Sequence, residues 1–433
     1  MKHYFIFVAF AVLVLASCST PPQVMIDRAI ADGEYSQAAK LHEQYKKKLY
    51  DNKSDILIGL NSGMLDYYIG NYEDSISTLQ STETAIEQAY TRSVTGAIAS
   101  TITSYIQETY AGEEYEDIYI NIYNALNYYH LGNIDEASVE IRKLSDKIAF
   151  IQAKYDALSA REEEKYLKSM AARYLLRDTN RLGVSVTYRK FVYKSALNDS
   201  ALGRYLGILF FRAMGMGDSA RVDFEAMEQL FFNAERLYNH PIPAVVREEL
   251  DVKPNEARLN IVGFSGLNPI VVKERVRHEL TSTLSFNAPK LLTRPSIVAK
   301  VEIQFTNGIL FEMGLLENLG QKQTELMTRF AEQEKLLSIK YAPAAVVASS
   351  TALWTIGIVP IAISFFTHNK VDTRVSRYFP DRVYVGGITL APGTYSFNVK
   401  YYDTSGGLIE SVPFENVRIE AGRLNLVEAN CFK

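Results

Sequence analysis

Apolar residues recur at helical spacing through the first half of the chain, most clearly between Tyr110 and Ile148. There Tyr115, Tyr119 and Tyr123 follow one another every four residues, which places them on one face of a helix. Gly132 comes next, a residue that readily ends a helix in the left-handed conformation. A second apolar series follows this glycine, so the pattern predicts two helices joined as a hairpin.

The second helix of this hairpin is expected to pack closely on the first. Ala137, Ile141 and Leu144 form its apolar face, and the small Ala137 allows close approach of the two helices. Asn133 and Asp135 stand near its start, where amide and carboxylate side chains cap free backbone N–H groups.

Segments similar to this glycine turn occur elsewhere in the chain. A small residue follows five positions after a glycine in four places, Gly33–Ala38, Gly70–Ser75, Gly132–Ala137 and, more loosely, Gly215–Ala220. This arrangement resembles the turn between the two helices of a tetratricopeptide repeat, but the glycines are unevenly spaced, whereas a strict array repeats about every 34 residues. Residues 24–240 are therefore expected to form a divergent helical solenoid whose concave face binds partners.

The residue pattern of the sequence changes after Pro241-Ile-Pro243. Stretches rich in β-branched and aromatic residues, bounded by Pro, Gly and Asn, occupy Ala257–Gly263, Pro295–Phe305, Tyr384–Val399 and Val417–Val427. Residues 241–433 are thus expected to form a small antiparallel, sandwich-like β domain with a helical insertion from about Glu312 to His368. The fold class predicted for the whole chain is α+β, with a tetratricopeptide-like half first.

One apolar segment allows two interpretations. Residues 342–367 contain no charged side chain and are long enough to span a bilayer. Pro343, Pro360 and the cluster Ser349–Thr351 interrupt the segment, which favours a buried or partner-covered helical hairpin. Contact with a membrane is the alternative.

The first residues have the organisation of an export signal. A short positive region, Met1–His3, precedes the apolar stretch Tyr4–Leu15, and Leu15-Ala16-Ser17-Cys18 follows. This resembles the lipobox of bacterial lipoproteins, which implies cleavage after residue 17 and lipidation of Cys18. Several acyl chains, at about 0.8 kcal/mol per buried methylene, make such an anchor effectively permanent. Residues 18–23 would be the tether, and Ser19, by resemblance to sorting rules, favours the outer membrane.

Cysteine content and charge narrow the possibilities further. With Cys18 lipidated, Cys431 has no cysteine left to pair with inside the chain. The net charge of −4 gives no basis for nucleic-acid binding, which requires a concentrated basic surface.

Several motifs together resemble a family of bacterial envelope lipoproteins that has a tetratricopeptide-like first half and no assigned activity. The residues that carry the resemblance are Tyr115-Glu116, Asn124–Tyr128, Gly132, Ala137, Val139–Arg142, Tyr205–Gly207, Ala220–Phe224, Asp372-Thr-Arg374, Pro380 and Leu390–Tyr395. Relatives usually carry a tryptophan shortly after the Asp-x-Arg, where this chain has Val375–Tyr378. The resemblance implies that the protein works together with lipoproteins that activate peptidoglycan synthases.

The candidate partner-binding residues lie in the central hairpin. Tyr115, Tyr119 and Tyr123 are either a recognition face or, as we favour, core between helices. Glu140 and Arg142 are either a recognition pair or members of inter-helix salt bridges, and we again favour the structural interpretation.

No stretch of the sequence matches a catalytic template. Gly263–Leu267 misses a nucleophile elbow by one position, and the histidines lack the spacing of a zinc site. We therefore predict no cofactor and no metal. The predicted protein is a lipid-anchored, non-catalytic scaffold or regulator that faces the periplasm and binds envelope proteins, with the peptidoglycan machinery as the favoured context. An envelope enzyme or glycan-binding protein, or a component of a transport or secretion assembly, is the alternative.

Overall fold

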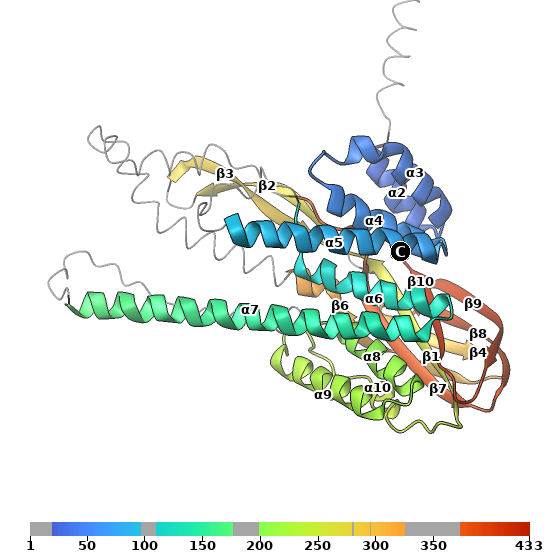
Figure 1. Ribbon diagram of the computed structural model, residues 1–433. Helices are drawn as coiled ribbons and strands as arrows, with labels where there is room; N and C mark the ends of the chain where they lie inside the picture. Colours follow the sequence, from blue (N-terminus) through green and yellow to red (C-terminus); the bar gives the residue numbers. More distant parts are fainter. Residues whose placement is uncertain (1–19, 97–109, 176–198, 279–280, 295, 325–372) are drawn as a thin grey trace, which may run out of the picture.

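The computed structural model describes residues 20–96, 110–175, 199–278, 281–294, 296–324 and 373–433. Helices occupy the first half of the described chain and strands the second (Figure 1). The predicted order of helices followed by strands is confirmed. Cys18 and residues 342–367 lie outside the described residues, so the predictions made for them are not addressed by the fold.

Within the described residues, the helices of the first half form four successive pairs. The pairs are α2 (Pro22–Ala31) with α3 (Tyr35–Leu49), α4 (Asp55–Tyr68) with α5 (Tyr72–Gly96), α6 (Glu114–His130) with α7 (Ile134–Leu175), and α8 (Ala201–Ala213) with α9 (Gly217–Asn233). Each pair turns at a glycine with a positive φ, namely Gly33 (77°), Gly70 (82°), Gly132 (79°) and Gly215 (72°). Glycine adopts this conformation without steric cost, which is why the motif repeats there.

The small residues five positions after these glycines are all buried between paired helices. They are Ala38, Ser75, Ala137 and Ala220. The helical hairpins predicted from the glycine motif are thus present at all four places. The helices differ widely in length, from 10 residues in α2 to 42 in α7. A tetratricopeptide-like superhelix stays a prediction.

The strands form two four-stranded sheets and a separate hairpin. The first sheet has the order β10 (Asn425–Cys431), β1 (Ala257–Leu267), β7 (Pro380–Leu390) and β6 (Gly314–Asn318). The second has the order β5 (Leu310–Glu312), β4 (Lys300–Phe305), β8 (Gly393–Tyr402) and β9 (Leu408–Ile419), and β2 (Ile270–His278) pairs with β3 (Thr281–Leu292). A short helix, α10 (Ala244–Glu248), joins the helical half to β1.

Strand β1 shows how the layers are stacked, because all eleven of its residues are buried. Val262 and Phe264 belong to the core shared with the helices, whereas Leu259 and Ile261 belong to the core shared with the second sheet. Alternate side chains of a strand point to opposite faces. The first sheet is therefore the middle layer, with helices on one face and the second sheet on the other, and the helical and strand halves share one hydrophobic core.

Two expectations for the second half need correction. Strand β10 pairs in parallel with β1, so the first sheet is not purely antiparallel. The region expected to be a helical insertion from Glu312 begins instead with the last residue of β5 and the strand β6, which pairs with β7, and helix starts only at Leu319. The apolar stretch around Gly314–Asn318 is too short to separate strand from helix by period alone.

Two elements extend beyond the body of the molecule. In Figure 1 the helix α7 and the β2–β3 hairpin both project past the other described elements on the same side. Among the described residues no helix is both long and apolar enough to cross a membrane.

Candidate functional site

The predicted tyrosine face does not lie open to a partner. Tyr119 and Tyr123 are completely buried and Tyr115 is 4% exposed. The rings of Tyr119 and Phe379 have centroids 5.1 Å apart, and the ring of Tyr123 lies 6.0 Å from that of Phe379. Phe379 immediately precedes β7, so the chain's own first sheet covers the face that was expected to be a groove. The three tyrosines therefore lie in the core, as the favoured interpretation expected, and the alternative of an exposed recognition face is wrong.

The physical reason for this closure lies in the middle sheet. One face of β1 and β7 carries Phe264, Val383 and Val385, which must be removed from water. The helical layer supplies the matching apolar surface, with Tyr123 6.2 Å from Phe264. Periodicity identifies the apolar face of α6, but not the element that covers it.

Glu140 and Arg142 have separate environments and do not form a pair. Glu140 is 2% exposed, accepts a hydrogen bond from Asn121 at 2.8 Å and pairs with Lys143 of its own helix at 2.8 Å. Arg142 is exposed and its guanidinium lies 5.9 Å from the centre of the Phe211 ring. The described residues thus show no inter-helix salt bridge for either side chain, which corrects that interpretation.

Two of the motifs quoted for the family resemblance meet in space. Residues 373–379, which we call the strap, cross the helical layer before β7. The backbone N–H of Ser376 donates to the carboxylate of Glu116 at 2.6 Å, and the hydroxyl of Tyr110 donates to the same carboxylate at 2.7 Å. Arg374 lies over the Tyr110 ring, 5.2 Å from its centre. Burial raises the pKa of Glu116, and these donors oppose that rise.

The strap is also fastened to the first described helix. Arg377 pairs with Asp27 of α2 at 2.8 Å, and Arg294, at the base of the β2–β3 hairpin, approaches the same carboxylate at 3.4 Å. Tyr378, also in the strap, is completely buried. These contacts make the strap a structural fastening between α2, the hairpin and the sheet.

A second polar cluster lies where the end of α6 meets β10. The Nε2 atom of His130 is 3.1 Å from Oε1 of Glu428, and the Tyr67 hydroxyl donates to Oε2 of the same carboxyl group. The ring of Tyr72 stacks on His130 with centroids 4.3 Å apart and an interplanar angle of 5°. No motif in the sequence marks this cluster. The available signal was Glu428 on the same strand face as the buried Leu424 and Leu426.

Burial keeps both ionisable groups of this cluster uncharged at neutral pH. It raises the pKa of Glu428 to about 8 and lowers the pKa of His130 to about 4. The contact is therefore a hydrogen bond between neutral groups, in which the carboxyl proton is donated to the imidazole nitrogen. A carboxyl and an imidazole at this distance can share one proton.

Glu428 also lines a surface pocket of about 300 Å³. The pocket is lined at the α2–α3 turn by Ala31, Asp32, Gly33 and Tyr35, and on β9 by Glu410–Pro413. The lining is completed by Glu428, Asn430 and Cys431 of β10 and by Phe432, the residue after it. Neighbouring Tyr129 caps the outer edge of β10, because the N–H of Leu426 donates to its hydroxyl at 2.8 Å.

Comparisons with protein families, with curated proteins and with solved structures found no match. Within the ranges that the structure describes, no group of three or more His, Cys, Asp or Glu side chains is arranged to hold a metal ion.

Proposed function

We propose that the protein is a lipid-anchored, non-catalytic scaffold of the bacterial cell envelope that faces the periplasm from the outer membrane. The observation that carries this proposal is the short interval between the lipobox-like cysteine and the folded body. Helix α2 begins at Pro22, four residues after Cys18. Four extended residues reach at most about 14 Å, so a lipid on Cys18 would hold α2 at the membrane surface.

The way in which α2 is fastened supports a rigid presentation of the body. Asp27 of α2 pairs with Arg377 of the strap, and Gln23 donates to the Tyr378 hydroxyl at 3.1 Å. A lipid on Cys18 would therefore hold the whole body near the membrane, because α2 is fixed to the layers behind it. A fixed body at the membrane is what a scaffold needs in order to present partners in a defined position.

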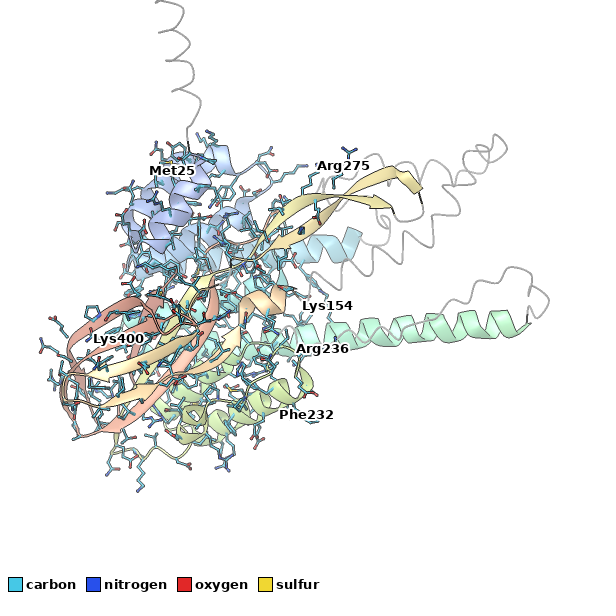
Figure 2. The ribbon with its side chains drawn as sticks, turned by 180° about the vertical axis from the view of Figure 1, so that it is seen from behind. Met25, Lys154, Phe232, Arg236, Arg275 and Lys400 are labelled. Carbon is cyan, nitrogen blue, oxygen red and sulfur yellow. The ribbon has the colours of Figure 1, made fainter. Side chains whose placement is uncertain are left out.

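The outer surface of the helical layer is the proposed site for protein partners, since the inner surface packs on the sheet. On α7, Val139 is 45% and Phe150 55% exposed, and the ring of Phe150 lies edge-on to Tyr90 of α5 at 5.7 Å. Lys154, labelled in Figure 2, lies 5.1 Å from the centre of the Tyr90 ring. Exposed aromatic residues beside a basic residue are typical of protein interfaces.

The lipid anchor is tested by the intact mass of the protein purified from envelope membranes. The expected species begins at Cys18 and carries the mass of a diacylglycerol and a further acyl chain. The variant Cys18→Ala is expected to stay uncleaved and unacylated. A wild-type protein that begins at Ser19, or that retains Met1 without lipid, would exclude the anchor.

The partner surface is tested by mild crosslinking in intact cells followed by affinity capture. We expect envelope proteins, with peptidoglycan synthases or their activators among them, to be captured with the wild type and lost with Phe150→Ser. The control is Val222→Ser on α9, where Val222 is 62% exposed. Equal capture by all three proteins would show that the α5–α7 surface does not bind the partner.

A further inference from the structure

The last turn of α3 carries three consecutive lysines, Lys46, Lys47 and Lys48. We infer that these lysines, together with Lys40 of the same helix, form a basic patch that binds the anionic phosphate headgroups of the membrane in which the protein is anchored. The inference rests on the proposed lipid anchor at Cys18 and adds to it an electrostatic contact made by the folded body. It follows from the position of the patch beside the tether and from its charge.

The end of α3 lies beside the start of α2, where the tether joins the body. Helices α2 and α3 pair around the turn at Gly33, so they run in opposite directions. Gln23, in the first turn of α2, donates to the Tyr378 hydroxyl at 3.1 Å. The His42 ring lies 6.3 Å from the Tyr378 ring, and its Nε2 atom is 3.0 Å from the hydroxyl of Tyr50, the residue after α3. These contacts bring the start of α2 and the end of α3 together at one side chain of the strap.

The tether is too short to carry this end of the body far from the membrane. Pro22 follows Cys18 by four residues, so the start of α2 stays within about 14 Å of the anchored cysteine. Lys48 precedes Tyr50 by only two residues. Charges at physiological ionic strength interact over about 8 Å. The patch is therefore close enough to interact with headgroups around the anchor when the α2–α3 end of the body turns toward the membrane.

The lysines of the patch carry more positive charge than neighbouring carboxylates neutralise. Lys46 pairs with Glu43 at 2.6 Å. Within the part of the chain that the structure describes, Lys40, Lys47 and Lys48 are exposed and form no ion pair. Lys40 and Lys47 are seven residues apart, which places them on one face of α3. The helix dipole favours cations in the last turn only, so it does not account for Lys40.

The next carboxylate along the chain is already engaged. Asp51 accepts a hydrogen bond from the Ser54 hydroxyl at 2.5 Å and another from the Lys53 backbone N–H at 3.0 Å. These bonds lower the pKa of Asp51 and hold its carboxylate in the turn before α4. Asp51 is thus occupied within its own turn, and the ammonium groups of the patch are left for an external anion.

The geometry of the patch suits a surface of many phosphates better than one small anion. Successive residues of a helix point about 100° apart, so the three lysines of the last turn diverge and do not converge on one ligand. Ammonium groups on flexible side chains act as point charges and are attracted to anionic lipid surfaces. Val24, 51% exposed in the first turn of α2, adds an apolar side chain at the same end of the body. A lipid chain combined with a basic patch holds a protein to a membrane more firmly than either alone.

The inference is tested on the full-length protein, purified from envelope membranes and inserted into nanodiscs of phosphatidylcholine with or without anionic phosphatidylglycerol. The uncharged reagent N-hydroxysuccinimide acetate modifies exposed lysines, and peptide mass spectrometry gives the rate at each one. We expect Lys46, Lys47 and Lys48 to react at least about threefold more slowly in the anionic nanodiscs. This protection should vanish in 1 M NaCl, where the screening length is about 3 Å. Lys253 is the internal reference, because it follows α10, which Figure 1 shows far from α2 and α3.

A pair of double variants places the effect in the patch. Lys47→Glu/Lys48→Glu should make the remaining Lys46 react at the same rate in the two kinds of nanodisc. The matched control, Arg236→Glu/Lys253→Glu, changes the net charge by the same amount at exposed positions, and Figure 2 shows Arg236 far from Met25 of α2. This control should keep the protection of Lys46. Circular dichroism verifies that both variants are folded.

Failure of this inference and failure of the lipid anchor are distinguishable, because the intact mass of the same sample reports the lipid. A protein without lipid would overturn both. A lipidated protein whose Lys47 and Lys48 react equally in neutral and anionic nanodiscs would overturn the membrane contact alone. The same conclusion would follow if Lys46 stayed protected in the folded Lys47→Glu/Lys48→Glu variant, or lost its protection in the control variant.

Discussion

The imidazole Nε2 of His130 lies 3.1 Å from Oε1 of Glu428, and this contact joins the end of α6 to the edge of the middle sheet. The carboxyl group is 7% exposed and also accepts from the Tyr67 hydroxyl. Burial makes both ionisable groups neutral at pH 7. The contact is therefore a hydrogen bond from the protonated carboxyl group to the neutral imidazole, and not an ion pair. Its strength must therefore depend on pH.

The variant Glu428→Gln isolates that dependence. The pKa of Glu428 rises from an ordinary 4.5 to about 8 on folding, so the wild type is stabilised below pH 4.5 and loses this stability as the pH rises through 8. Glutamine has no proton to lose. We expect the variant to be more stable than the wild type at pH 9 by on the order of 2–4 kcal/mol, and within about 1 kcal/mol of it at pH 5.

Urea unfolding at pH 5, 7 and 9 measures this difference, with Glu415→Gln as the exposed control on β9. His130 has its own effect, since its lowered pKa removes stability as the pH falls from 6.5 toward 4; this window includes pH 5, but the loss affects the wild type and the variant alike and cancels in their difference. A difference between wild type and Glu428→Gln that is constant across the three pH values would contradict the protonated state of Glu428.

A second prediction concerns the close contact of α8 and α9 at Gly207. A Cβ atom placed on Gly207 would lie 2.1 Å from Oδ2 of Asp223, whose other oxygen pairs with Arg204 at 2.9 Å. The side chain of Asp223 is 5% exposed, so it has little room to move. Gly207→Ala is expected to lower the free energy of unfolding by about 2–4 kcal/mol, through overpacking and disturbance of the buried ion pair.

The matched control is Gly217→Ala, at the first position of α9. No atom lies within 4 Å of the Cβ that would be added there. This variant should be neutral or more stable than the wild type by about 0.5 kcal/mol, because alanine restricts the unfolded chain. Equal effects of the two variants in urea unfolding would show that α8 and α9 are not packed as closely as described.

The glycine turns and the tyrosine face illustrate what local sequence can predict. Gly132 and Ala137 fix a hairpin through short-range geometry, and every such turn in the described chain is found at its expected place. The covering of Tyr123 by Phe264 and Phe379 depends on residues far along the chain, which a local period does not contain. The parallel pairing of β10 with β1 is equally non-local, so the site around Glu428 could not be assembled from the sequence.

The shared core predicts cooperative unfolding of the two halves. Tyr123 is fully buried where the helices meet the middle sheet, so Tyr123→Ala removes contacts in both layers. We expect the free energy of unfolding to fall by about 3–5 kcal/mol. We also expect a single unfolding transition, with the same midpoint in the circular dichroism of the helices and in the amide exchange of β1 and β7.

Phe150→Ala is the control. Because Phe150 is 55% exposed, this variant should lower the free energy of unfolding by less than about 1 kcal/mol. Separate transitions for the helical and strand signals in either variant would mean that the halves fold as independent domains.

The strap provides the last prediction, because one carboxylate holds it to the helices. Glu116 is completely buried and accepts from Ser376 N–H at 2.6 Å, Tyr110 O–H at 2.7 Å and Glu113 N–H at 2.8 Å. Glu116→Ala leaves these buried donors without their acceptor, which should lower the free energy of unfolding by about 3–5 kcal/mol. Glu116→Gln keeps one amide oxygen as an acceptor and should cost less.

A stability loss alone would not locate the effect, so the measurement is amide hydrogen exchange along the strap. In Glu116→Ala the exchange rates of the Ser376 and Arg377 amides should rise at least tenfold more than those of β8, which has no contact with Glu116 and should change only by the factor that the lost global stability sets. Glu136→Ala, an exposed glutamate on α7, should change neither. If the strap amides of Glu116→Ala exchanged faster only in proportion to those of β8, the strap would be held by Phe379 and Tyr378 in the core, and the Glu116 carboxylate would be dispensable for its position.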